Sequence, residues 1–486
     1  MESKEKAAVS PSKPSTAPTM EQEDLQRKLK PRHMEMIAIG GAIGVGLFYG
    51  SAGAIQQAGP AVLLVYLFCG LAIFFICRAV GEMSVEEPVS GGVVSYSTRY
   101  LHPFVGFFLG WNSLLTTAAF SGAEFNALGK YVQYWFPQVP IWASGLCVLA
   151  FILLINLVSV AAFGELEFWL SSIKVITIIL MIVMGMFIIL TGVGNGGKAV
   201  GFGNLVSNGG FFPNGLQGIL FAVVLVAFSF GGTDSVAYTA GEAEDVKKTI
   251  PKAVNSVFWR IVIFYVGATL VMLCMWPWNK IGTSGSPFVE VFAKIGIPAA
   301  ASIINFVVIT AAVSSQNSGM YTTSRQMYNL ALQGRAPKFM TKVSKRKVPY
   351  ATMFVIVAIQ LVGVIANMVV PEKAFSYFSS LVVFGLVSGW VCELLCKYRY
   401  RKMKIKNGQE SQLSFKMPWW PYSSYFALAF MVLVMVMMAL MPDYRVTYYV
   451  APIWVLILYV AYRIQNKRKA SAEKIQEAAH QEKNTD

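Results

Sequence analysis

The chain has 486 residues, of which 55% are hydrophobic and only 13% are charged, and its mean hydropathy is +0.55. A typical soluble domain has about 25% charged residues. Apolar runs of about 20 residues, the length that crosses the hydrocarbon core of a bilayer, recur from Met34 to Tyr462. The composition therefore predicts an all-α polytopic membrane protein and excludes an ordinary soluble enzyme.

The net charge of +15 raises the question of nucleic-acid binding, and the distribution of the charges answers it. When the apolar runs are followed along the chain, 33 of the 40 lysines and arginines lie on one side of the membrane and six on the other. This asymmetry follows the positive-inside rule, which predicts an even number of spans and both termini in the cytoplasm. We expect no nucleic-acid partner, and we interpret the basic runs 342–347 and 397–402 as topological anchors that contact anionic lipids.

The first 30 residues are rich in Ser, Pro, Lys and Glu and lack apolar periodicity, which is typical of a disordered tail. We expect no cleavable signal peptide, because the first 33 residues contain no apolar core. Residues 31–465 form one predicted transmembrane domain, and 466–486 form a cytoplasmic C-terminal tail. The twelve predicted transmembrane helices are 34–58, 60–80, 103–129, 141–162, 168–191, 216–241, 257–277, 298–324, 350–370, 374–396, 421–441 and 446–462.

The first predicted span contains a glycine-rich stretch from Gly40 to Phe48. Glycines permit non-helical backbone and let a ligand approach the freed amide groups, and the N-terminus of a half-helix favours a carboxylate. The spacings Gly40–Gly44 and Gly46–Gly50 also fit close packing between membrane helices. This stretch alone supports both interpretations equally.

The sixth predicted span contains a second interruption, from Phe228 through Gly231 and Gly232 to Asp234. Freed carbonyl groups at Phe228, Ser229 and Gly231 would suit an ammonium group, because broken membrane helices present carbonyls as well as amides to a bound ligand. A site with amide donors from one break and carbonyl acceptors from the other suits a zwitterion. The two breaks together therefore favour an α-amino acid as the ligand.

The positions of the two breaks also predict the architecture. Spans 1 and 6 are five spans apart, and an odd number of spans inverts the second half of the chain relative to the first. We predict an inverted repeat with one half at about 34–191 and the other at about 216–396. The two helices within 421–462 lie outside this repeat.

Three ionisable side chains lie inside predicted spans, where charge is costly and usually functional. Lys174 either extends its ammonium group to the nearby membrane surface or is buried, and a buried lysine can exchange a proton and couple transport to a proton gradient. Glu124 either faces the central cavity or pairs with another helix. Asp234 either contacts the ligand or caps the broken helix.

Span 8 carries a polar stripe at helical spacing, formed by Ser314, Asn317, Ser318 and Tyr321. Such a stripe either bonds neighbouring helices together or lines a polar pathway. The two broken spans favour the pathway.

Other motifs do not support catalysis. The stretch Gly192–Lys198 resembles a phosphate-binding loop, but Ala199 stands where such a loop needs Ser or Thr, and an apolar span precedes it in place of a strand. Cys392 and Cys396 share a helix face without the further ligands of a metal site. We therefore expect no enzyme activity, no metal and no cofactor, with a proton as the coupling ion.

Five separated stretches carry a resemblance to a known family: 40–48 (GGAIGVGLF), 164–175 (GELEFWLSSIKV), 239–244 (TAGEAE), 249–253 (TIPKA) and 317–320 (NSGM). They resemble bacterial amino acid permeases of the amino acid–polyamine–organocation superfamily, in its amino acid transporter branch, over about residues 24–465. The resemblance implies a five-plus-five inverted-repeat (LeuT-like) fold with two extra helices, substrate at the breaks in spans 1 and 6, and proton symport. It also implies that Lys174 takes the place of the sodium ion of sodium-coupled relatives, and that spans 1, 2, 6 and 7 rock against spans 3, 4, 8 and 9.

Two departures from the family pattern bear on the substrate. The family usually has hydroxyl residues where Ala42 and Val45 stand, so that backbone amides alone are left to bind a carboxylate. It usually has Glu where Asp234 stands, so that this carboxylate reaches less far.

We predict a permease of the cytoplasmic membrane that imports a small neutral amino acid together with a proton. Its predicted proton-coupling residue is Lys174, and its predicted substrate-binding residues are Gly41, Ala42, Gly44, Val45, Glu124, Phe228, Ser229, Gly231, Asp234 and Ser314. The alternatives are a cationic amino acid or amine permease, an exchanger and, more distantly, a channel or receptor. The identity of the amino acid and the oligomeric state stay open.

Overall fold

The computed structural model describes residues 32, 36, 43–89, 92–192, 197–233, 246–282, 286–294 and 298–483. Every regular element in this part of the chain is a helix. Three of the predicted site residues, Gly41, Ala42 and Asp234, lie outside the described residues, as does the predicted tail 1–30.

The helices follow the predicted spans closely. In the first predicted repeat they are η1 (Gly46–Gly50), α2 (Ser51–Ala58), η2 (Gly59–Ala61), α3 (Val62–Glu86), α4 (Gly92–Tyr100), α5 (Pro103–Gln133), α6 (Ile141–Val158) and α7 (Val160–Thr191). In the second they are η3 (Gly203–Leu205), α8 (Gly215–Ser229), α10 (Val246–Arg260), η5 (Ile261–Gly267), α11 (Ala268–Met275), η6 (Trp278–Lys280), α12 (Pro287–Lys294), α13 (Pro298–Leu332), η7 (Lys338–Thr341), α14 (Tyr350–Val369) and α15 (Pro371–Lys406). Beyond the repeats lie η8 (Glu410–Gln412), α16 (Tyr422–Leu440), η9 (Pro442–Tyr444) and α17 (Val446–Lys483).

Ten helical segments of the described chain are long and apolar enough to cross a membrane. The difference from twelve has two sources. The segment Gly46–Glu86 is counted once although it holds η1, α2 and α3, and α8 has only 15 residues in its described part. Gly59, at φ +61°, ends α2 and separates it from α3. The all-α polytopic fold is therefore confirmed, whereas the count of twelve and the two broken helices stay predictions.

Local capping explains where several helices begin and end. His102 caps α5 by accepting a hydrogen bond from the Phe104 amide at 3.1 Å, and Pro103 occupies the first helical position. Ser159 separates α6 from α7 because its backbone is extended and its hydroxyl accepts from the Ala162 amide at 3.1 Å. These caps satisfy amide groups that a helix leaves without internal partners.

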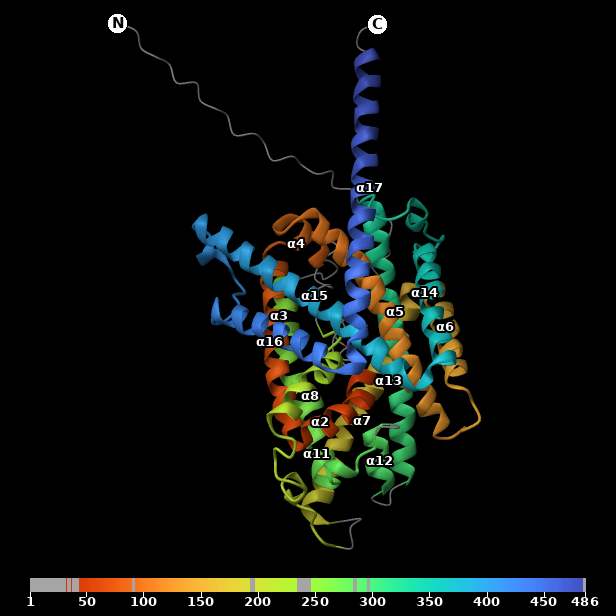
Figure 1. Ribbon diagram of the computed structural model, residues 1–486, viewed down its shortest axis with the longest axis vertical. Coiled ribbons are helices and arrows are strands. Elements are labelled where there is room, and N and C mark those ends of the chain that lie inside the picture. Colours follow the sequence, from red (N-terminus) through yellow and green to blue (C-terminus); the bar gives the residue numbers. More distant parts are fainter. Residues whose placement is uncertain are drawn as a thin grey trace, which may run out of the picture.

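Helix α5 is the centre of the bundle, since it packs against α6, α13, α14 and α15. Figure 1 shows α4 and the projecting end of α17 at one end of the molecule, and α11 and α12 at the other. The short helices α4 and α12 were not predicted, because their nine and eight residues fall well below the length of a span.

A glycine-lined seam joins η1 and α2 to α8. A Cβ atom on Gly46 would lie 2.5 Å from Ser229 Cα, and one on Gly50 would lie 3.5 Å from the Phe228 ring. The Ser229 hydroxyl also donates to the Gly46 carbonyl at 2.8 Å. The Gly46–Gly50 spacing therefore serves the close helix packing that was one of its two interpretations.

The basic end of α15 is partly buried in an ion-pair network. Lys397 and Arg401 approach the Glu82 carboxylate of α3 at 3.3 and 2.7 Å, and Arg401 also pairs with Glu410 at 3.0 Å. Glu82 and Lys397 are fully buried. For these two basic residues the interpretation as lipid contacts is wrong, because a carboxylate from a helix distant in sequence faces them inside the protein.

Candidate functional site

Three fully buried ionisable side chains lie where α5, α7 and α13 meet the start of η1. They are Glu124 on α5, and Glu167 and Lys174 on α7, each with no exposed surface. An isolated charge in such a position is costly, and partners reduce that cost. The geometry around each side chain therefore indicates its role.

Lys174 joins two other elements to α7. Its Nζ donates to the Ile43 carbonyl at 3.1 Å, directly before Gly44, and to Ser314 Oγ of α13 at 2.9 Å. Because the side chain is fully buried, the interpretation in which Lys174 extends to the membrane surface is wrong for this structure. The ammonium group instead tethers the segment that leads into η1.

Glu167 is the acidic partner on the same helix, and the sequence analysis missed it. Its carboxylate accepts hydrogen bonds from Ser171 at 3.1 Å, from Ser314, and from Asn317 at 3.1 Å. The predicted span began at residue 168, which placed Glu167 outside the membrane. The spacing of Glu167, Ser171 and Lys174, at i, i+4 and i+7, puts all three on one helix face and could have revealed the pair.

Ser314, one of the predicted substrate-binding residues, contacts both charged side chains of α7. Its hydroxyl accepts from Lys174 and donates to Glu167, so it bridges the ammonium and the carboxylate. Asn317 on the same stripe accepts a hydrogen bond from Asn156 of α6 at 2.8 Å. The ring of Tyr321, also on α13, stacks on an aromatic ring of α7. Interhelical bonding, the alternative for this polar stripe, therefore accounts for its contacts with α6 and α7.

Glu124 lies on the other side of α13 and faces the start of η1. Gln316 Nε2 donates to its Oε2. Its Oε1 lies 3.6 Å from the position that a Gly44 Cβ would occupy, and has no hydrogen-bond partner among the described residues. The Val45 amide and the Ser315 hydroxyl lie close enough to interact with the carboxylate. The side chain thus pairs with α13 through one oxygen and faces the glycine stretch with the other, while its place in a central cavity stays a prediction.

The start of η1 carries the described part of the first predicted break. Leu47 and Phe48 donate their amides to the Gly44 carbonyl at 3.2 and 3.4 Å, which closes the first turn. The amides of Gly44 and Val45 precede that turn and so have no partner within it. These amides lie beside Glu124, and the Val45 amide interacts with its carboxylate. The carboxylate site at this stretch stays a prediction.

The end of α8 carries the described part of the second predicted break. Helix α8 ends at Ser229, and Gly232 has a positive φ of 83°. The Ser229 carbonyl accepts from the Tyr265 hydroxyl at 2.9 Å, and the Phe228 carbonyl accepts from the Gly231 amide at 3.2 Å. Two of the three carbonyls predicted for an ammonium group are thus already bonded in this conformation.

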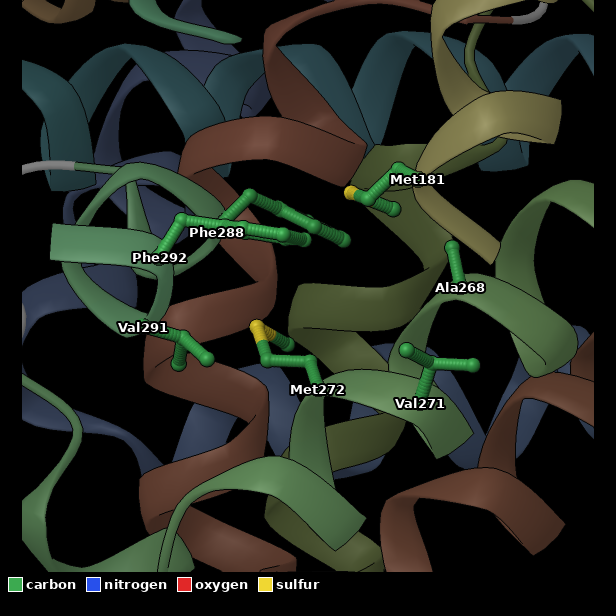
Figure 2. Close-up of a pocket in the computed structure, with 7 residues that line it drawn as sticks. All are labelled: Met181, Ala268, Val271, Met272, Phe288, Val291 and Phe292. Atoms are coloured by element: carbon green, nitrogen blue, oxygen red, sulfur yellow. The ribbon is translucent and has the colours of Figure 1, made fainter. Parts of the chain in front are cut away.

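A separate gap lies between α7, α11 and α12 (Figure 2). It is lined by Met181, Ala268, Val271, Met272, Phe288, Val291 and Phe292. All seven side chains are apolar, so the gap offers no hydrogen-bonding group to the charged ends of an amino acid. In the described part of the chain, polar groups that could bind such a ligand lie around Glu124 and Lys174.

Comparison of the sequence with known proteins shows the family of this chain. The amino acid permease family model matches residues 33–475. The chain is 45% identical to the uncharacterized amino acid permease YtnA of Bacillus subtilis, over 93% of this chain and 97% of that protein. It is 43% identical to the probable threonine/serine transporter YbxG of the same organism, over 95% of this chain and 100% of that protein, and 40% identical to its amino-acid permease AapA, over 92% and 96%. The chain belongs to the amino acid permease family of the amino acid–polyamine–organocation superfamily, and it is a multi-pass membrane transporter of amino acids, not an enzyme.

Proposed function

We propose that this permease imports a small neutral amino acid together with a proton by alternating access. The observation that carries the proposal is the burial of Lys174 between the start of η1 and α13. Its ammonium group binds Ser314 and the Ile43 carbonyl, which lies within the proposed substrate-binding stretch, directly before Gly44. Gain or loss of one proton at this position changes the strength of both contacts.

The neighbouring charges support this coupling role. Lys174 lies within electrostatic range of both Glu167 and Glu124. An ammonium group is attracted to these carboxylates and binds Ile43 and Ser314 more strongly than a neutral amine does, since charge-assisted hydrogen bonds are about twice as strong as neutral ones. Deprotonation of Lys174 loosens the tether to Ile43 and allows the start of η1 to move. A ligand shifts the equilibrium between two conformations only if it binds one of them more tightly. Here the two conformations are the tethered and the released start of η1, and the ligand is the proton on Lys174.

The proposed substrate site lies between the start of η1 and the end of α8. The amides of Gly44 and Val45, with Gly41 and Ala42 before them, bind the carboxylate of the amino acid. Phe228, Ser229 and Gly231 at the end of α8 contribute the opposite side, Asp234 follows them in the sequence, and Glu124 borders the space. The seam between Gly46 and Ser229 supports this arrangement, because it holds the two proposed breaks side by side.

Two observations support a small, neutral substrate. Ser315 Oγ and Glu124 Oε1 lie 3.4 and 3.6 Å from the position that a Gly44 Cβ would occupy, so that both side chains limit the space beside Gly44 and favour a small substrate. The relative YbxG is named a probable threonine/serine transporter, and the chain matches its full length. We therefore place serine, threonine and alanine first among the candidate substrates. We place the protein in the cytoplasmic membrane, and the charge asymmetry supports an orientation with both termini in the cytoplasm.

The proposal is tested with purified protein in liposomes. The Lys174→Ala variant should lose accumulation driven by an inward proton gradient, while it retains counterflow of the substrate between the two compartments. Lys406→Ala, at the exposed end of α15, is the matched control and should accumulate substrate like the native protein. Full concentrative uptake by Lys174→Ala under the same gradient would refute the coupling role.

The substrate class is tested by competition of all twenty amino acids for uptake, with and without a proton uncoupler. Serine, threonine and alanine should compete best, and the uncoupler should abolish accumulation. Strong competition by lysine or arginine would contradict the neutral substrate. Accumulation that survives the uncoupler and requires internal amino acid would identify an exchanger.

A further inference from the structure

Helix α14 contributes a polar side chain to the interior for which the proposed function has no role. Gln360 is fully buried, and its Nε2 donates to Ser121 Oγ of α5 at 2.7 Å and lies 3.4 Å from Gln316 Oε1 of α13. A buried amide is retained only where hydrogen bonds offset its desolvation. Gln360 thus has a specific partner on each of two neighbouring helices.

These contacts determine which way Gln316 points. Its Oε1 accepts from Ser121 at 2.7 Å and from Gln360 at 3.4 Å. With its oxygen held by two donors, the amide must direct its Nε2 to the opposite side, where it donates to Glu124 Oε2. The series of hydrogen bonds from Gln360 through Gln316 therefore ends on Glu124, the carboxylate that borders the proposed substrate site.

The approach of α14 to α5 makes this series possible. A Cβ atom on Gly363 would lie 3.0 Å from Gly122 Cα, so the two helices cross at backbone contact. One turn before Gly363 on α14, Gln360 can therefore reach past α5 to α13. Asn367 lies on the same seam and donates to the Gly122 and Gly363 carbonyls at 2.9 and 2.8 Å.

Helix α5 contacts both proposed breaks, the first through Glu124 and the second through Phe120. Phe120, one turn earlier on the same face, stacks on Phe228 with ring centres 5.3 Å apart, and it would contact a Cβ on Gly231 at 2.8 Å. Glu124 Oε1 faces Gly44 and has no hydrogen-bond partner among the described residues. Because the Tyr265 hydroxyl already donates a hydrogen bond to the Ser229 carbonyl, the ammonium group of a substrate needs another acceptor.

We propose that Gln360 is a positioning residue for substrate recognition: through Gln316 it holds Glu124 with one oxygen bonded and the other, Oε1, free to accept a hydrogen bond from the substrate ammonium group. The inference rests on the proposed amino acid site. It assigns to α14, which contributes no proposed contact to the substrate, a determinant of affinity.

The test compares Gln360→Leu with Asn367→Leu by counterflow in liposomes without a proton gradient, so that the result does not depend on Lys174 or on coupling. Gln360→Leu should raise the KM for serine and for alanine by about tenfold each, as expected for one weakened charge-assisted contact, with Vmax per folded transporter within about twofold of native. Asn367→Leu breaks the same helix seam away from Gln316, and should lower thermal stability without changing KM.

Three outcomes would overturn the inference. An unchanged KM in Gln360→Leu would show that the side chain does not act on binding. An equal rise of KM in Asn367→Leu would show that the seam as a whole, and not the positioned carboxylate, sets affinity. A rise for serine but not for alanine would assign Glu124 to the substrate hydroxyl and would refute the contact with the ammonium group. A failure of the proton-coupling proposal gives a different result. In that case gradient-driven accumulation does not depend on Lys174, while the KM values of Gln360→Leu and Asn367→Leu still differ.

Discussion

The seam between η1 and α8 can be tested by adding a single methyl group at Gly46. In the Gly46→Ala variant the new Cβ would lie 2.5 Å from Ser229 Cα and 3.2 Å from Ser229 N. Both are backbone atoms, so no side-chain rotation relieves the clash. Since carbon atoms pack best at about 3.5–4.0 Å, the two helices must separate by about 1 Å.

The separation carries an energetic cost that can be estimated from the contacts. Overpacking of this kind costs about 1–3 kcal/mol, and weakening of the 2.8 Å bond from the Ser229 hydroxyl to the Gly46 carbonyl adds about 1 kcal/mol. The higher helix propensity of alanine returns about 1 kcal/mol. The variant should therefore be destabilised by about 1–3 kcal/mol, and its substrate affinity should fall because the two proposed breaks move apart.

Thermal unfolding of the purified protein in detergent and counterflow in liposomes measure these two effects. Gly53→Ala is the matched control, because it lies on the same seam and its Cβ would meet only the flexible end of Leu225, at 3.4 Å. This control should unfold at or slightly above the native temperature and keep the native KM. If Gly46→Ala unfolds at the native temperature and transports with the native KM, the reasoning about the seam is refuted.

Two further predictions concern stability. Glu82→Gln should destabilise the protein by about 3–5 kcal/mol, since it leaves the buried Lys397 without its counter-charge. In a thermal unfolding assay, the double variant with Lys397→Met should recover most of this loss. Native-like stability of the single variant would contradict the prediction. Ser159→Ala should cost about 1 kcal/mol through loss of the α7 cap, whereas Ser172→Ala, which removes only a bond to the Phe168 carbonyl of its own helix, should be nearly neutral by the same measurement. Equal melting temperatures for the two serine variants would count against the cap.

The helical elements could be predicted from the sequence because each depends on local properties. A run of about 20 apolar residues specifies a membrane helix wherever it occurs, and Pro, Gly and extended Ser residues mark its ends. The predicted span 350–370 corresponds to α14, and 421–441 corresponds to α16, within one residue at each end. The unusual burial cost of Lys174 and Glu124 also depends on local context, so both could be selected as candidate site residues before any contact was known.

The contacts between helices could not be predicted in the same way. A membrane helix is apolar towards lipid as well as towards protein, so hydropathy does not reveal which face turns inward. Glu167 was missed because the ionisable residue itself ended the apolar run and moved the predicted boundary past it. The basic residues Lys397 and Arg401 were assigned to lipid because Glu82, their partner, lies more than 300 residues away in the sequence.

For this protein the sequence alone determined the class, the approximate positions of its spans, the stretches of glycine at the two proposed breaks, and two of the three buried charges of the candidate site. The tertiary structure decided that Gly46 packs against Ser229, that Ser314 bridges Lys174 to Glu167, and that Gln360 orients Gln316 towards Glu124. The physical reason is that helix formation in a membrane is local, whereas the pairing of polar side chains depends on how helices distant in the chain rotate and cross.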